Sequence, residues 1–276
     1  MPELPDVDAA RLIATRVATG RRIVDAQCAD DRIVYDRVDP QRFRRALIGR
    51  RVLGAHRRGK HLWLELDRRP WPCFHFGMTG GFHIPTAPGP KLVSSRIKSR
   101  GTEWPPRFTK LRLFFDDGGE LVMSDPRRLG RIRLRQDPAK EPPISLLGFD
   151  ALLEIPSARE LRQLLATRSG PIKAVLLDQG FSAGVGNWIA DEVLYQARID
   201  PRRSGSSLTA DEVNRLRARL RYVMTTAVRA RSDSRRFPRW WLFHARWDRD
   251  VSVRGEKLRR ATIGGRTTAW APAVQK

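Results

Sequence analysis

The opening residues Met1-Pro2-Glu3 could perform covalent chemistry on a sugar. Once Met1 is removed, Pro2 carries a terminal secondary amine with a pKa of about 8, so a fraction of it is unprotonated at neutral pH. Such an amine can attack the anomeric carbon of deoxyribose and form an iminium ion. The iminium acidifies the neighbouring sugar proton, so loss of a base could be followed by β-elimination of the strand phosphate. Glu3 is placed to protonate the sugar ring oxygen or the departing base.

The charge of the chain favours nucleic acid as its partner. The 276 residues include 53 Lys and Arg against 30 Asp and Glu, a formal net charge of +23. A field of this size attracts phosphate and releases counterions on binding. The alternative, a protein with an ordinary charged surface, is less favoured because such surfaces mix both signs. No apolar run is long enough for a membrane span and no signal peptide is recognisable, so we expect an intracellular protein.

The cysteines and histidines do not indicate a metal site. Cys28 and Cys73 are too few for a disulfide framework or a four-cysteine zinc site, and we interpret them as buried free thiols. The five histidines contain no i, i+4 pair of the kind that binds zinc on a helix. We therefore predict neither a metal nor a cofactor.

Hydrophobic periodicity predicts a β-rich first half. Apolar residues recur at helical spacing over 6–18, and Gly20 follows where a C-terminal cap belongs. Four runs then alternate with period two, over 60–66, 111–115, 120–123 and 131–135. We therefore expect a buried helix packed on a β-sandwich or barrel. Residues 84–106 are rich in proline and basic residues without periodicity, and we interpret them as a mobile basic loop.

The second half is predicted to be helical. Ser157 with Glu160, and Thr209 with Glu212, fit the capping box that begins a helix. A helix from Pro171 to about residue 179, a glycine-rich double turn and a second helix from residue 187 lie between them. The tail returns to short strand-like pieces that end in a hairpin.

The first residues resemble the start of the formamidopyrimidine-DNA glycosylase and endonuclease VIII family. The resemblance covers residues 1–7 and implies that Pro2 is the nucleophile and Glu3 its acid. Residues 57–60 are similar to the family segment whose lysine contacts phosphate beside the lesion and assists elimination, which implies this role for Lys60. Residues 75–80 are similar to the segment whose methionine fills the space left by an extruded base, which implies Met78.

Residues 125–130 resemble the family loop that enters the DNA helix. By this resemblance Arg127 faces the orphaned base. Leu129 takes the wedge position, where many relatives have phenylalanine, and an apolar side chain can still unstack bases. Lys110 is a further DNA-binding residue by the same resemblance.

Residues 178–192 are similar to the family's helix-two-turn-helix, the most specific internal match. Its glycine-rich turn and helix N-terminus form an anion site, to which Asn187 adds a side-chain donor. Arg168 and Lys173 lie upstream, where the family also contacts DNA. Glu192 is expected to support the turn structurally.

Residues 263–268 resemble the tip of the family's terminal finger, whose arginine grips phosphates around the lesion. This implies Arg266 as a phosphate-binding and catalytic residue. Ala271 and Val274 stand where most relatives have the last pair of zinc-binding cysteines. We therefore predict a zincless finger, similar to that of plant and fungal relatives and without metal. Apolar packing would hold it in place of zinc, and the candidates are Trp240, Trp241, Trp247 and Trp270.

The fold class that these features predict is α+β. A β-sandwich domain with a buried N-terminal helix is expected over 1–135 and a linker over 136–150. A helix-two-turn-helix domain is expected over 151–238 and a zincless-finger hairpin over 239–276. The resemblance covers almost the whole chain.

The function implied is that of a bifunctional DNA glycosylase and abasic-site lyase. It would act as a monomer on damaged double-stranded DNA, in a bacterial cytoplasm or nucleoid or a eukaryotic nucleus. Residues 230–238 lack the glycine-rich stretch that caps oxidised guanine in bacterial members. Formamidopyrimidines and further-oxidised guanines are therefore the expected substrates. Two alternatives stay open, a lyase restricted to abasic sites and a lesion-binding protein without turnover.

Overall fold

The computed structural model describes residues 1–85 and 103–276. Most of the basic loop predicted over 84–106 therefore lies outside the described residues. The chain divides into two compact units, Met1–Leu146 and Leu147–Lys276. Their boundary falls within the predicted linker, and each unit is described by itself.

The first unit is built mainly from strands. It contains, in chain order, α1 (Leu4–Ala18), β1 (Ile23–Cys28), α2 (Pro40–Leu47), β2 (Val52–Arg58), β3 (His61–Leu66), β4 (Trp71–His75), β5 (Gly81–His83), β6 (Thr109–Phe115), β7 (Glu120–Ser124) and β8 (Arg131–Arg135), followed by a short 3-10 helix (Ile144–Leu146).

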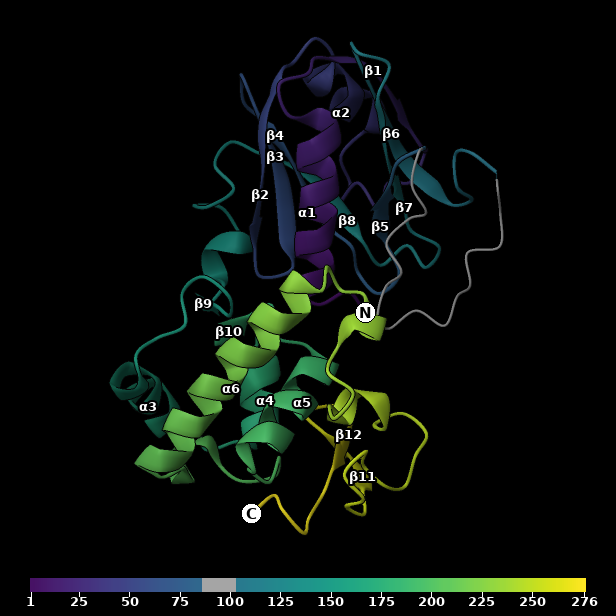
Figure 1. Ribbon diagram of the computed structural model, residues 1–276. Helices are drawn as coiled ribbons and strands as arrows, with labels where there is room; N and C mark the ends of the chain where they lie inside the picture. The colour runs from purple at the N-terminus through teal and green to yellow at the C-terminus, as the bar shows by residue number, and fades with distance from the viewer. Residues whose placement is uncertain (86–102) are drawn as a thin grey trace. The chain divides into compact units, whose positions relative to one another are not determined.

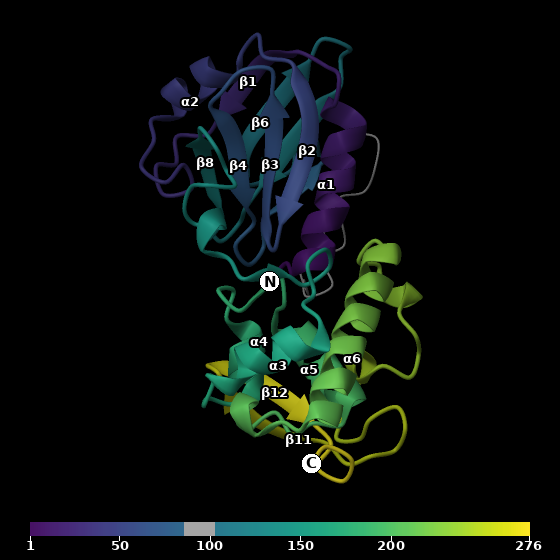
Figure 2. The ribbon, with the colours of Figure 1, turned by 90° about the vertical axis from the view of Figure 1, so that its left-hand side faces the viewer.

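The strands of this unit form two four-stranded antiparallel sheets, ordered β1-β6-β7-β5 and β2-β3-β4-β8 among the described residues. Figure 2 shows the second sheet face-on, with the first behind it and α1 along their side. In β3 the buried residues are Leu62, Leu64 and Leu66, because successive side chains of a strand point to opposite faces. These leucines join one core cluster with apolar residues of both sheets and α1. The predicted sandwich therefore forms.

Helix α1 lies against both sheets, packing on the edge strands β2 and β5 (Figure 1). It begins two residues before the predicted start, with Glu3 as its N-cap and Pro5 in the first turn, where proline's missing N–H costs nothing. Its buried side chains include Val7, Ala10 and Ala14, which follow the predicted helical spacing. The packing fixes the start of the chain on the sandwich.

The second unit is mainly helical. It contains β9 (Phe149–Asp150), α3 (Ala158–Ala166), α4 (Ile172–Leu177), β10 (Ser182–Ala183), α5 (Asn187–Ala197), α6 (Ala210–Arg229), β11 (Arg259–Ile263) and β12 (Arg266–Trp270), with 3-10 helices at Gly205–Ser207, Ser234–Arg236 and Leu242–His244. Both predicted capping boxes are present, at Ser157 and Thr209. Helix α5 is buried on almost every side.

The chain ends in the predicted hairpin, in which β11 and β12 pair antiparallel. Gly264 and Gly265 join the strands with φ of 60° and 70°. A two-residue hairpin turn with positive φ at both positions favours glycine because other side chains are strained there. Within the described ranges, no helix has the length and apolar character needed to cross a membrane.

Candidate nucleic-acid interface and catalytic site

The predicted catalytic residues of the first unit are Pro2, Glu3 and Lys60. Pro2 and Glu3 are buried at the start of α1, and the Glu3 backbone N–H donates to Asp6 Oδ2 at 2.8 Å. Because the chain described includes Met1, the Pro2 nitrogen is here part of a peptide bond. Lys60 is buried in the turn between β2 and β3.

An ion pair joins the helix start to the turn that carries Lys60. Arg57 Nε lies 3.4 Å from Asp8 Oδ1, and both side chains are buried. Arg57 also donates to the Gly59 carbonyl at 3.3 Å. Gly59 has a φ of 55°, which lets the chain turn sharply before Lys60. The pair therefore holds the Lys60 turn against α1, close to the end of the helix that carries Pro2 and Glu3.

The loops that carry Met78 and Leu129 pack against each other. The completely buried Asp125 accepts hydrogen bonds from Gly130 N at 2.7 Å and Thr79 Oγ1 at 3.2 Å. Gly77 lies so close that a Cβ built on it would be 2.4 Å from the Leu129 carbonyl carbon. The predicted space-filling methionine and the predicted wedge are thus presented by two adjoining loops.

Asp31 anchors the loop that carries Arg127 and Leu129. Its carboxylate accepts from Arg128 Nε at 2.9 Å and from Lys110 Nζ at 2.8 Å. Burial favours its neutral form, but the hydrogen bonds from Arg128 and Lys110 outweigh this and hold the pKa of Asp31 well below its usual range. Arg128 reaches Asp31 with its guanidinium although its side chain, like those of Arg127 and Leu129 on either side, is exposed. Lys110 thus holds the loop, a role that the sequence did not indicate.

In the second unit, one hydrogen bond joins Asn187 to the strand of Arg266. Asn187 is the first residue of α5, and its Nδ2 donates to the Thr267 carbonyl at 2.9 Å. Arg266 precedes that carbonyl on β12 and is exposed. Arg168 is partly exposed, 3.5 Å from Asp178 and over the Phe181 ring. The structure thus brings together two of the predicted phosphate-binding residues, Asn187 and Arg266.

Comparison with known proteins decides the family. A model described as the formamidopyrimidine-DNA glycosylase N-terminal domain matches residues 1–132, and one described as the H2TH domain of the same glycosylase matches residues 147–238. The chain belongs to the formamidopyrimidine-DNA glycosylase family. A protein of that name from Arabidopsis thaliana is 42% identical over 278 residues, which cover 100% of this chain and 71% of the relative. One from Methylocella silvestris is 34% identical over 303 residues, with both chains covered fully.

Solved structures of formamidopyrimidine-DNA glycosylases share the fold. The Lactococcus lactis enzyme, bound noncovalently to DNA containing an AP site, aligns with a TM-score of 0.82, 21% identity and 99% of each chain covered. The same enzyme with FAPY-dG-containing DNA gives a TM-score of 0.81. The predicted family and fold class are therefore confirmed.

Lys173 corrects one of the residue assignments made from the family. Its side chain is completely buried, and its ammonium lies 2.6 Å from Asp191 Oδ1, 2.7 Å from Thr268 Oγ1 and 3.2 Å from the Thr267 carbonyl oxygen. The prediction that Lys173 contacts DNA is wrong in this structure, because no part of the side chain reaches the surface. Its partner Asp191 was missed, although a carboxylate inside an apolar helix is itself a signal of a buried ion pair.

The finger of this family member is held without zinc ligands. Ala271 and Val274 pack with Leu242, Ala245 and Leu258 in an apolar cluster. These side chains do not fit zinc, which binds thiolate, imidazole or carboxylate. In the part of the chain that the structure describes, no group of three or more His, Cys, Asp or Glu is arranged to hold a metal ion.

The tryptophans hold the finger only in part. Trp270 lies buried at the end of β12, and Trp241 is completely buried. Trp240 instead stacks on Tyr222 of α6, at 6.2 Å between ring centroids. Trp247 is 46% exposed. The ring of Trp247 lies over the guanidinium of the buried Arg246 and is not part of the apolar cluster that holds the finger, so the predicted packing is not seen for this residue.

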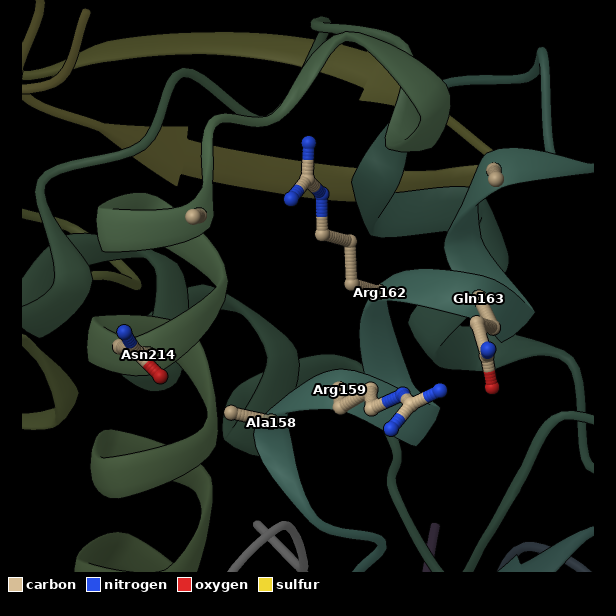
Figure 3. Close-up of a pocket in the computed structure, with 7 residues that line it drawn as sticks. Ala158, Arg159, Arg162, Gln163 and Asn214 are labelled. Atoms are coloured by element: carbon tan, nitrogen blue, oxygen red, sulfur yellow. The ribbon is translucent and has the colours of Figure 1, made fainter.

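A hollow of about 460 Å³ between α3 and α6 lies apart from these residues (Figure 3). Its lining consists of Ala158, Arg159, Arg162, Gln163, Ala166, Ala210 and Asn214. Figure 3 shows the two arginine side chains extending from α3 in different directions. The hollow includes none of the predicted site residues, so we assign it no part in catalysis.

The turn of the finger rests on α4, and this contact can be tested. A Cβ on Gly264 would lie 3.0 Å from Ala174 Cα, whereas one on Gly265 would meet nothing within 4 Å. Both glycines have positive φ, so alanine is strained at either position by about 1–2 kcal/mol. We expect Gly264→Ala to lower the free energy of unfolding by at least 1 kcal/mol more than Gly265→Ala, because overpacking adds about 1–3 kcal/mol. Urea denaturation of both variants measures this, and equal losses would contradict the contact.

Glu192 gives the second unit a pH-dependent stability. Burial raises the pKa of Glu192 to about 7 from its ordinary value of 4.5, although Gln196 and the Phe243 N–H donate to it. Between these pH values the folded chain keeps a proton that the unfolded chain releases, so the free energy of unfolding falls as the pH rises through this window. At about 1.4 kcal/mol per pKa unit, the loss across this window is on the order of 3 kcal/mol.

We therefore expect Glu192→Gln to flatten the fall in stability between pH 5 and 8. Urea denaturation at both pH values measures it, with the exposed Asp248→Asn as a control for loss of a negative charge. A fall of the same size in Glu192→Gln and in the wild type would show that another group titrates.

Proposed function

We propose that this chain is a bifunctional DNA glycosylase of base-excision repair, which excises an oxidised base and then nicks the strand as an abasic-site lyase. The observation that carries the proposal is the buried Pro2-Glu3 pair at the head of α1, with the Lys60 turn held against the same helix by Arg57 and Asp8. The relatives' name, formamidopyrimidine-DNA glycosylase, supports excision.

The reaction would begin at the Pro2 nitrogen after Met1 is removed. Its lone pair forms a bond to C1′ of the extruded nucleotide while the bond from C1′ to the base breaks, and Glu3 supplies a proton either to the departing base or to the ring oxygen. Ring opening gives an iminium between the proline and C1′. Water takes up a C2′ proton, a double bond forms between C2′ and C3′, and the 3′ phosphate leaves, while Lys60 and Arg266 balance phosphate charge. Hydrolysis of the iminium then releases the sugar and frees Pro2.

DNA binding would use both units. Asn187 and the N-terminus of α5 supply neutral donors to phosphate, and Arg266 supplies charge. Met78 would fill the space left by the extruded base, with Arg127 and Leu129 entering beside it. We propose formamidopyrimidines and further-oxidised guanines in damaged duplex DNA as the substrates. One copy of the chain would bind the DNA, in the nucleoid or the nucleus, and would need no cofactor.

The test separates excision from nicking. A duplex with one formamidopyrimidine and a duplex with one abasic site are incubated with substoichiometric protein, and free base and nicked strand are both quantified. The proposal predicts several turnovers of both products, unchanged by a strong chelator. Nicking of the abasic-site duplex without release of a base would show that the protein is only an abasic-site lyase. Stoichiometric binding without any product would show that it is only a lesion-binding protein.

A further inference from the structure

We propose that the buried ion cluster of Lys173, Asp191 and Arg246 positions the Thr267 carbonyl and, through it, sets Asn187 and Arg266 as one phosphate-binding unit. The inference rests on the proposed function in that the phosphates are those of DNA. It makes these three residues positioning residues, which touch neither the substrate nor the reacting atoms.

The cluster joins four separate segments of the second unit. Lys173 comes from α4 and Asp191 from α5, and their charged atoms are 2.6 Å apart. Arg246, which follows the Leu242–His244 helix, donates to Asp191 Oδ2 through Nη2 and, at 3.1 Å, through Nε. The same oxygen accepts from Ala269 N of β12 at 3.3 Å. One carboxylate thus ties two helices, the segment after α6 and the finger.

Burial gives these contacts a defined geometry. The side chains of Lys173 and Asp191 are completely buried and that of Arg246 is 2% exposed. Two cations against one carboxylate leave an excess positive charge, which is costly in an apolar interior unless nearby acceptors satisfy it. The Lys173 ammonium has three donors, and three acceptors are in reach, namely Asp191, the Thr268 hydroxyl and the Thr267 carbonyl.

The Thr267 carbonyl is the point at which the cluster meets the DNA-binding residues. It accepts from Lys173 Nζ at 3.2 Å and from Asn187 Nδ2 at 2.9 Å. Holding this carbonyl fixes the direction of the Asn187 amide, since its NH₂ must face the oxygen. It also fixes the backbone one residue after Arg266. A displaced Thr267 would therefore loosen both phosphate contacts together.

A purely structural cluster would behave differently. Replacement of a buried ion cluster by apolar side chains of similar size is often neutral or stabilising, so stability alone does not require these charges. Positioning requires the hydrogen bond from Lys173 to the Thr267 carbonyl. Lys173→Met removes it and leaves Asp191 and Arg246 as a balanced pair.

A double-mutant cycle of Lys173→Met with Arg266→Gln tests the proposal in the full chain. The probe is a duplex containing a reduced abasic-site analogue, and its dissociation constant is measured from low to high salt. We expect Lys173→Met to weaken binding about tenfold and to lower the salt slope by about 1, the value for one lost phosphate contact. The factor by which Arg266→Gln raises the dissociation constant should be at least three times smaller in the Lys173→Met background than in the wild type.

Additive effects with an unchanged salt slope would overturn the proposal. The matched control is Arg203→Gln with Glu212→Gln, an ion pair of the same unit away from Thr267, which should leave the cycle unchanged. Should Lys173→Met not fold, the apolar replacement Lys173→Met, Asp191→Leu and Arg246→Met enters the same cycle with the same expected coupling. Because the readout is binding, failure of the proposed chemistry would appear separately, as absent product from wild-type protein.

Discussion

A chain whose Pro2 nitrogen stays acylated is expected to lose base excision and strand nicking by on the order of 10³-fold or more, because an amide nitrogen is not a nucleophile. The variant carries one leucine inserted between Met1 and Pro2, which keeps Pro2 inside the chain. Its affinity for abasic-site DNA should stay within a few-fold of the wild type, since Asn187, Arg266 and Lys60 are unaltered. Single-turnover rates on a formamidopyrimidine duplex measure the loss.

The control uses the same extension with a protease site placed directly before Pro2. Activity should be absent before cleavage and return once Pro2 becomes the first residue. Excision at the wild-type rate with the extension in place would show that another group attacks the sugar, and the assignment of Pro2 would be wrong.

Glu3→Gln is expected to separate the two activities. Loss of a general acid slows a step by about 10²–10⁴-fold, so excision of a formamidopyrimidine should fall by that amount. Nicking of a preformed abasic site should change much less, because no base has to leave. The substitution is isosteric and keeps the backbone hydrogen bond from residue 3 to Asp6 Oδ2, so α1 should still begin at the same place.

Asp6→Asn is the matched control for Glu3→Gln. It makes the same change of charge three residues away, on an acid that caps the helix through the Glu3 N–H. Excision should be largely retained in this variant. Equal losses from both would indicate that the charge at the head of α1 matters and that Glu3 is not the acid.

Local patterns made much of the fold predictable. The predicted runs over 60–66 and 131–135 agree with β3 and β8, because strict alternation is a property of the strand itself. The capping boxes at Ser157 and Thr209 likewise form where their residues predict. By contrast β4 has three consecutive buried residues, so period two is absent and it was not foreseen. Strand order also depends on contacts between distant residues, as in the pairing of β1 with β6.

Contacts between distant residues also decided which residues of the candidate site could be predicted. Family motifs located Asn187 and Arg266, and the structure joins them through the Thr267 carbonyl. No motif indicated that Lys173 points inward, because its partners Asp191 and Thr268 come from other segments. The ion pair between Asp31 and Arg128 spans 97 positions and was missed for this reason. Residue types and motifs thus indicated which side chains could bind phosphate, whereas tertiary contacts decided which charged side chains are buried.

Covalent trapping tests the central claim most directly. The wild-type protein, with Met1 removed, is mixed with an abasic-site duplex in the presence of borohydride, and the adduct is digested and mapped by mass spectrometry. We expect one reduced adduct on the N-terminal peptide, with the added mass on the Pro2 nitrogen. An adduct on a lysine, or no adduct in protein that nicks the strand, would contradict it.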